Sequence, residues 1–205
     1  MLGQRLRWPR LAATASLAAA IAVGACEGES VKVPADSVIN LSGEFSSDFA
    51  LVDQHGRQVR NTDFRDRIMV VYFGFATCPD VCPLALSRLS AALDELSPSE
   101  RASLAPIFIT VDPERDTPEA LARFLAFDDR IIGLTGPVEA VDAARASYRV
   151  YARRQPMPDS ALKYTVDHSS FFYVVDKKGR VDFALKDSLT PAELAAALRR
   201  SIPAR

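Results

Sequence analysis

Long apolar runs alternate along this chain with segments of helical periodicity, and this alternation most constrains the fold. The runs at residues 67–76 and 105–112 are almost entirely apolar. Between them, residues 83–96 carry leucines near helical spacing, with Pro83 acceptable at the first helical position. A continuous apolar run of this length predicts a strand buried on both faces. Repetition of strand and helix predicts an α/β fold, a mixed sheet covered by helices.

The remaining segments continue the pattern. They predict two short strands at 49–60, a helix at 117–127 capped by Thr117, a strand at 130–136, a helix at 137–154, a hairpin at 171–185 and a capped helix at 190–202. Residues 155–170, "QPMPDSALKYTVDHSS", contain two prolines and are interpreted as an irregular loop. This order fits a thioredoxin-like fold, with Cys78 and Cys82 at the end of a central strand, where α/β sheets bind ligands.

The first 26 residues have the composition of an export signal. Three arginines precede an apolar stretch at residues 11–23, which is shorter than the roughly 20 residues of a spanning helix. The stretch ends in Val23-Gly24-Ala25-Cys26, which resembles a bacterial lipobox and predicts lipid attachment at Cys26. A plain signal peptide or a short membrane anchor are the alternatives. All three place the protein on the outer side of the cytoplasmic membrane, in the bacterial cell envelope, where disulfides persist.

The segment after Cys26 predicts a flexible connection to the membrane. Residues 27–44 show neither helical nor strand periodicity and are interpreted as a tether, which leaves residues 45–205 as the folded domain. The formal net charge is −1 with no basic stripe, which argues against nucleic acid as a partner. Three cysteines in 205 residues also exclude a disulfide-rich scaffold.

Cys78 and Cys82 form the one close cysteine pair in the sequence "GFATCPDVCP". Three interpretations are open: a structural disulfide, a redox pair, or two ligands of a metal site. Cys82 is expected at a helix start, where free N–H groups lower a thiol pKa. In a helical turn, positions i and i+4 stand about 5–6 Å apart at Cβ. That separation suits two sulfurs at one metal, although a modest movement allows a disulfide.

A metal site needs further ligands, and the chain has two histidines to supply one. His55 lies beside Gly56 in a predicted turn and is interpreted as solvated. His168 directly precedes the predicted hairpin and is either a core histidine or a ligand; the scarcity of other soft ligands favours the ligand. Structural zinc ordinarily takes four protein ligands. Two thiolates and an imidazole match copper(I) better.

Three blocks of the chain together resemble one known family. "GFATCPDVCP", "TVDPERDTPE" and "YTVDHSSFFYVVDKKG" resemble the signature blocks of the Sco/SenC family, over roughly residues 45 to 200. The resemblance implies a thioredoxin-like copper protein in which Cys78, Cys82 and His168 bind copper(I), with copper(II) left open. It also implies delivery of copper to the CuA centre of cytochrome c oxidase subunit II, reduction of that centre's cysteines, or both.

Aspartates near these blocks have two interpretations. Asp112 and Asp116 fit ordinary turn and helix-cap chemistry, or they tune the site from outside the ligand set. Asp167, or the Asp112 block, is a candidate to fix the tautomer of His168; a backbone carbonyl is the other. Four phenylalanines (Phe73, Phe75, Phe171 and Phe172) are predicted core residues, and Arg153 and Arg154 are predicted at a solvated helix end.

Two functions remain in competition. The first is a metallochaperone, with a copper donor, a copper acceptor and a thioredoxin-like reductant as partners. The second is an enzyme, a thiol–disulfide oxidoreductase that uses the same cysteines. Oxidoreductases of this fold usually have a two-residue spacer and a cis-proline where this chain has Asp167-His168, which favours the first. The peroxiredoxin pattern Pro-x3-Thr-x2-Cys is missing around both cysteines.

Overall fold

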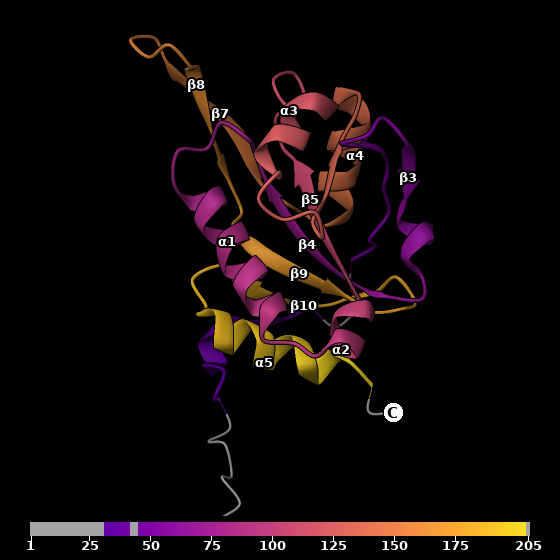
Figure 1. Ribbon diagram of the computed structural model, residues 1–205. Coiled ribbons are helices and arrows are strands. Elements are labelled where there is room, and N and C mark those ends of the chain that lie inside the picture. Colours follow the sequence, from indigo (N-terminus) through magenta and orange to yellow (C-terminus); the bar gives the residue numbers. More distant parts are fainter. Residues whose placement is uncertain (1–30, 42–44, 204–205) are drawn as a thin grey trace, which may run out of the picture. The chain divides into compact units, whose positions relative to one another are not determined.

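A mixed sheet of eight strands organises the part of the chain that the structure describes (Figure 1). The computed structural model describes residues 31–41 and 45–203, all within one compact unit, Val31–Arg205. The predicted signal peptide and Cys26 lie outside the described residues. The strand order is β1-β10-β9-β4-β5-β6-β2-β3, and the predicted α/β class, a central mixed sheet flanked by helices, is confirmed.

The elements have the following bounds. The strands of the sheet are β1 Val38–Asn40, β2 Ala50–Asp53, β3 Gln58–Arg60, β4 Ile68–Gly74, β5 Leu104–Thr110, β6 Ile132–Thr135, β9 Phe171–Val175 and β10 Val181–Lys186. The helices are η1 Ala35–Ser37, η2 Asn61–Phe64, α1 Val81–Asp94, α2 Pro98–Ala102, α3 Pro118–Phe124, α4 Val138–Ser147 and α5 Pro191–Ser201. A separate two-stranded ribbon consists of β7 Ala152–Met157 and β8 Lys163–His168.

Strands β4 and β5 form the centre of the sheet. They pair in parallel, and every residue of both strands is buried. Parallel strands covered on both faces need continuous apolar sequence, which explains the two long apolar runs. On its other side β4 pairs antiparallel with β9. The carboxyl ends of β4 and β5 therefore lie side by side at one edge.

Helices cover this sheet and are capped as the sequence predicts. α1 and α5 lie side by side, α3 packs on β6, and α4 packs on β2. The Thr117 side chain accepts the N–H of Ala120 at the start of α3. Thr190 and Glu193 form a capping box at the start of α5. These caps satisfy N–H groups that a helix start leaves free.

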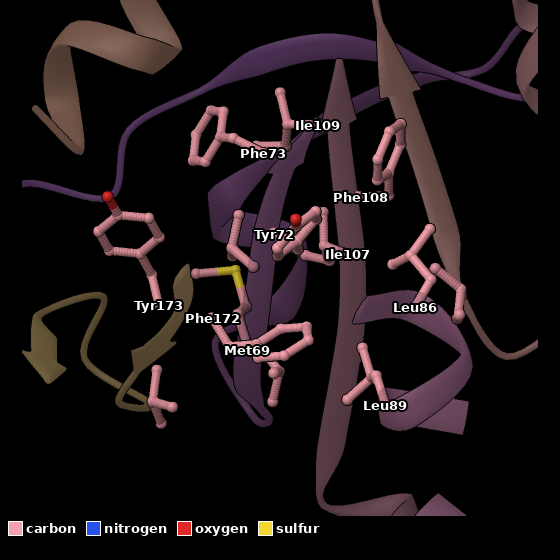
Figure 2. Packing of buried hydrophobic residues seen from close by; sticks show 14 of the residues in the cluster. Met69, Tyr72, Phe73, Leu86, Leu89, Ile107, Phe108, Ile109, Phe172 and Tyr173 are labelled. Carbon is pink, nitrogen blue, oxygen red and sulfur yellow. The ribbon is translucent and has the colours of Figure 1, made fainter. Parts of the chain in front are cut away.

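Aromatic side chains fill the core on both faces of the sheet (Figure 2). The ring centroids of Tyr72 and Phe172 are 5.1 Å apart. Of the predicted core residues, Phe73, Phe75 and Phe172 are buried and Phe171 is half-buried. The prediction that these four residues belong to the core is confirmed.

The segment predicted as an irregular loop is instead a β-hairpin. β7 and β8 pair antiparallel from Ala152–His168 to Met157–Lys163. The predicted helix at 137–154 ends at Ser147, so Arg153 and Arg154 lie on β7 and not at a helix end. Pro156 is tolerated because both strands of a two-stranded ribbon are edge strands, and each needs backbone N–H groups for pairing on one side only. Figure 1 shows the tip of this hairpin projecting beyond the neighbouring elements.

The predicted tether also contains structure. Residues 35–40 form η1 and β1, and β1 pairs with β10 at the edge of the sheet. The folded part therefore begins before residue 45. Three residues are too few to show a period, which is why the sequence did not reveal this strand. Among the described residues, no helix has the length and apolar character needed to cross a membrane.

Gly74, at the end of β4, is tightly enclosed. A Cβ atom there would lie 2.9 Å from both Cys82 Sγ and Phe108 Cε2. We expect Gly74→Ala to lower the free energy of unfolding by about 1–3 kcal/mol, the usual cost of overpacking a buried site. Gly136→Ala is the matched control, because its Cβ would meet Leu51 Cδ2 at 3.5 Å, an ordinary contact. Thermal denaturation of both variants is the measurement; equal melting temperatures would contradict the expectation.

Candidate metal centre

The two cysteines lie where the chain leaves β4 and enters α1. Cys78 is in the connecting loop, and Cys82 is the second residue of the helix. A helix starts at the cysteines as predicted, but it begins at Val81, so Pro83 is its third residue and not its first. Asp80 at the N-cap makes no capping bond through its side chain. The sulfur of Cys78 takes this role instead, because Cys82 N–H points to it at 3.4 Å.

His168, the last residue of β8, approaches the same thiols. Its Nε2 atom lies 3.5 Å from Cys82 Sγ, and its Nδ1 atom lies 2.9 Å from the carbonyl oxygen of Ser169. A carbonyl only accepts, so Nδ1 carries a proton, and in this tautomer the Nε2 lone pair faces the sulfurs. The rings of Tyr72 and Phe75 stand edge-on to the imidazole, with centroids at 6.3 and 5.8 Å.

The three predicted aspartates lie around this group in different roles. Asp167 is exposed and accepts a hydrogen bond from Gln155 at 2.8 Å, so the backbone carbonyl and not this carboxylate orients His168. Asp116 is fully buried, and its Oδ2 accepts from Ala76 N–H at 2.9 Å and from Thr110 Oγ1 at 2.6 Å. It thereby ties the loop that leads to Cys78 to the end of β5. Burial raises the pKa of Asp116.

Asp112 is also fully buried but faces the hairpin. Its Oδ1 accepts from the hydroxyl of Tyr164 at 2.8 Å, and its carboxylate pairs with Arg115 and Arg154. The predicted turn is present as well, since Asp116 N–H donates to the Asp112 carbonyl at 3.0 Å. Both buried carboxylates thus make contacts beyond turn chemistry.

The two thiols have unequal electrostatics. Hydrogen bonds from the Cys82 thiol and from the Cys82 N–H lower the pKa of Cys78 to about 4 despite partial burial. The same bond to Cys78, together with its own burial, raises the pKa of Cys82. The expectation that the helix start lowers the pKa of Cys82 is therefore wrong, and the lowered pKa belongs to Cys78. Cys78 is half-exposed and Cys82 is buried. The pair therefore holds one accessible thiolate and one enclosed thiol.

A cavity of about 310 Å³ opens onto these groups. Its lining includes Phe75, Cys78, Val81, Val166 and His168. Cys78 and His168 are thus reachable from outside, by an ion or by a side chain of another protein.

The donor set fits a soft metal ion, with one adjustment. Metal–sulfur and metal–nitrogen bonds of about 2.3 and 2.0 Å place two ligands roughly 3.5–3.8 Å apart, and Cys82 and His168 already have this separation. Cys78 instead bonds to the helix start. Within residues 31–41 and 45–203, no three His, Cys, Asp or Glu side chains stand ready to hold a metal ion. The thiolate of Cys78 must therefore turn toward the other two donors.

The second histidine, His55, is exposed at the turn between β2 and β3, as predicted. Sequence reasoning missed Tyr72, whose hydroxyl bonds Ser170 at 2.8 Å, while Ser170 donates to Asp187. It also missed Tyr164 and Arg115. Tyr72 looked like any core residue of an apolar run, so no sequence signal separated it.

The unequal thiols lead to a prediction for the metal-free, reduced protein. At pH 6 we expect iodoacetamide to label Cys78 much faster than Cys82, because an ordinary thiol is only about 0.3% ionised there, whereas Cys78 is a thiolate down to about pH 4. Fragmentation of the labelled peptide by mass spectrometry locates the label. Equal labelling, or faster labelling of Cys82, would show that the thiolate is not at Cys78.

Comparison with known proteins adds independent information. The family model described as SCO1/SenC matches residues 39–203. "Protein sco1" of Schizosaccharomyces pombe is 39% identical over 152 residues, 73% of this chain. The chain spans 58% of that relative's length.

Solved structures are similar over the same region. ScoI of Bradyrhizobium japonicum with copper bound has a TM-score of 0.70 and 35% identity, covering 77% of this chain and 99% of that one. Yeast Sco1 with copper bound has a TM-score of 0.70 and 34% identity, covering 76% of this chain and 87% of that one.

Proposed function

This chain belongs to the SCO1/SenC family, and on that premise we propose that it binds one copper(I) ion through Cys78, Cys82 and His168. We propose further that it delivers this ion to the CuA centre of cytochrome c oxidase subunit II. The family consists of copper-binding proteins of cytochrome c oxidase assembly, and homologues have been solved with copper bound.

One observation carries the proposal: the position of His168. Its Nε2 lone pair faces Cys82 Sγ at 3.5 Å, and the Ser169 carbonyl holds the proton on the other nitrogen. Two thiolates and a neutral imidazole suit copper(I), which prefers soft ligands. Thiol exchange alone has little use for an oriented imidazole.

The ligand residues have different roles when the copper ion binds. Cys78 enters as a thiolate, so binding one ion displaces a single proton, the one on Cys82. The cavity beside Cys78 and His168 admits the ion, and buried Cys82 forms the inner end of the site. Copper is the cargo of this site.

The same cysteines support a second candidate function, a thiol–disulfide oxidoreductase. The low pKa of Cys78 favours it, because an accessible thiolate attacks a disulfide and Cys82 then displaces the partner's sulfur. The products are a Cys78–Cys82 disulfide and a reduced partner. That disulfide removes two copper ligands, and a thioredoxin-like reductant must restore both thiols with two electrons and two protons. Redox state thus gates copper binding.

The location proposed for this activity is the bacterial cell envelope. A lipid on Cys26 holds the domain at the membrane on its outer side, where a copper donor, the acceptor and the reductant meet it. Residues 27–34, and not the whole of 27–44, serve as the tether, since η1 begins at Ala35.

Copper binding is tested directly on purified protein. Reduced protein is expected to hold one copper(I) per chain, and disulfide-bonded protein essentially none. His168→Ala is expected to weaken retention by about 10–100-fold or more, and Asp116→Ala by about 10-fold through the loop that it anchors. Competition with a copper(I) chelator measures each variant, with circular dichroism as a check on folding.

His55→Ala is the matched control, because His55 is the exposed second histidine. It is expected to bind like the parent. An unchanged affinity in His168→Ala, or an equal loss in His55→Ala, would remove His168 from the site.

Delivery is tested in a bacterial strain that lacks this protein, by the copper content of subunit II. Parent protein should restore metallation; His168→Ala and the Cys78→Ser/Cys82→Ser variant should not. If His168→Ala restores it fully while the cysteine variant fails, the oxidoreductase function replaces the chaperone.

Lipid attachment is tested in the same strain. Cys26→Ser protein is expected outside the membrane fraction, because it lacks the residue that carries the lipid. The mass of the parent's mature N-terminus should show a lipid on Cys26; a mature terminus that begins after Cys26 would exclude the anchor.

A further inference from the structure

The β7–β8 hairpin carries His168, and one cluster of side chains holds it to the rest of the fold. We propose that this cluster, formed by Asp112, Arg115, Arg154 and Tyr164 and here named the clasp, positions His168 against Cys82. The inference rests on the proposed function of His168 as a ligand. It adds residues that touch neither the thiols nor the ion and act through the hairpin.

Tyr164 of β8 is the centre of the clasp. The guanidinium carbons of Arg115 and Arg154 lie 3.9 and 4.6 Å from its ring centroid, within cation–π range. Its hydroxyl donates to Asp112 Oδ1 at 2.8 Å. Tyr164 thus joins the hairpin to the loop that follows β5.

Arg115 adds bonds to the hairpin backbone. Its Nη1 donates to the carbonyls of Tyr164 at 3.1 Å and Leu162 at 3.3 Å, while its Nε donates to Asp112. From β7, Arg154 pairs with Glu114 at 2.7 Å and with Asp112 at 3.4 Å. The Asp112 side chain has no exposed area, so two guanidinium groups and a phenol stabilise its buried charge.

The hairpin depends on such contacts because it lies outside the main sheet. β7 and β8 pair only with each other among the described strands, and a two-stranded ribbon is marginally stable alone. At its base, Ser169 N–H bonds the Tyr151 carbonyl at 2.9 Å. That bond closes the hairpin on itself. Buried Val166, a bond from Arg145 Nη2 of α4 to the Ala152 carbonyl at 3.1 Å, and the clasp attach the hairpin to the rest of the fold.

Strand geometry transmits the position of Tyr164 to His168. Side chains of a strand alternate, so Tyr164, Val166 and His168 point to one side of β8, with Tyr164 about 13 Å from His168 along the strand. A shift of the clasp therefore tilts the face that carries the imidazole. The loop after β5 also holds the Cys78 loop through Asp116, so one short segment sets both ligand-bearing parts.

The first test needs no copper. Tyr164→Phe removes one hydroxyl. Arg115→Lys keeps the positive charge but loses the planar guanidinium group with its several N–H donors. We expect both to shift or broaden the imidazole resonances of His168 in the reduced, copper-free protein, while those of His55 stay in place. Tyr151→Phe is the matched control, since that exposed tyrosine loses the same hydroxyl outside the clasp.

The second test measures copper(I) retention by chelator competition, with circular dichroism as a check on folding. Tyr164→Phe should weaken it by about 10-fold, as outer contacts of a ligand do, and should cause no further loss when His168 is already Ala. Tyr151→Phe should match the parent. The pair of backgrounds separates action through His168 from general damage.

Two results would overturn the clasp: His168 resonances at parent positions in both clasp variants, or an equal copper loss with and without His168. Should the parent hold no copper(I), the proposed function fails, and the resonances still decide whether the clasp positions His168.

Discussion

The parallel pairing of β4 with β5 is the constraint on which the site depends. Gly74 and Thr110, the last residues of these strands, are partners, and Val111 N–H bonds the Gly74 carbonyl at 2.7 Å. Parallel strands end at the same edge of a sheet. The loop after β4, which contains Cys78, and the loop after β5, which contains Asp112 and Asp116, therefore leave the sheet side by side. Gly74 also leaves room for Cys82 Sγ directly beside the backbone.

Two buried carboxylates then link the ends of these strands to the ligands. Asp116 holds the loop before Cys78, and Asp112 holds the hairpin of His168. A buried carboxyl group is costly unless its oxygens are hydrogen-bonded or ion-paired, so each of the two restricts the geometry of the groups around it. The donors of the site are thus held by backbone groups and by two buried carboxyl groups that do not line the cavity.

The asymmetry of the cysteines follows from the same placement. Cys78 lies before helix α1 and faces the cavity, whereas Cys82 lies within the first turn of α1 and is buried in the core. Their mutual hydrogen bond leaves the charge on the exposed sulfur. One arrangement thus serves both copper binding and thiol exchange, and it couples the two activities.

By itself the sequence determined the α/β class, the strand–Cys-x3-Cys–helix junction, the helix caps and the solvated position of His55, because local periodicity and capping chemistry decide these features. It misassigned residues 35–40 and 152–168, where strands are short, partly polar and interrupted by proline, and pair only with distant or exposed partners. Only the tertiary structure decided that His168, 86 residues from Cys82, approaches its sulfur, that the Ser169 carbonyl and not Asp167 orients the ring, and that Asp112 reaches Tyr164. These contacts join segments whose encounter depends on sheet order and hairpin docking, and no local pattern of residues encodes either.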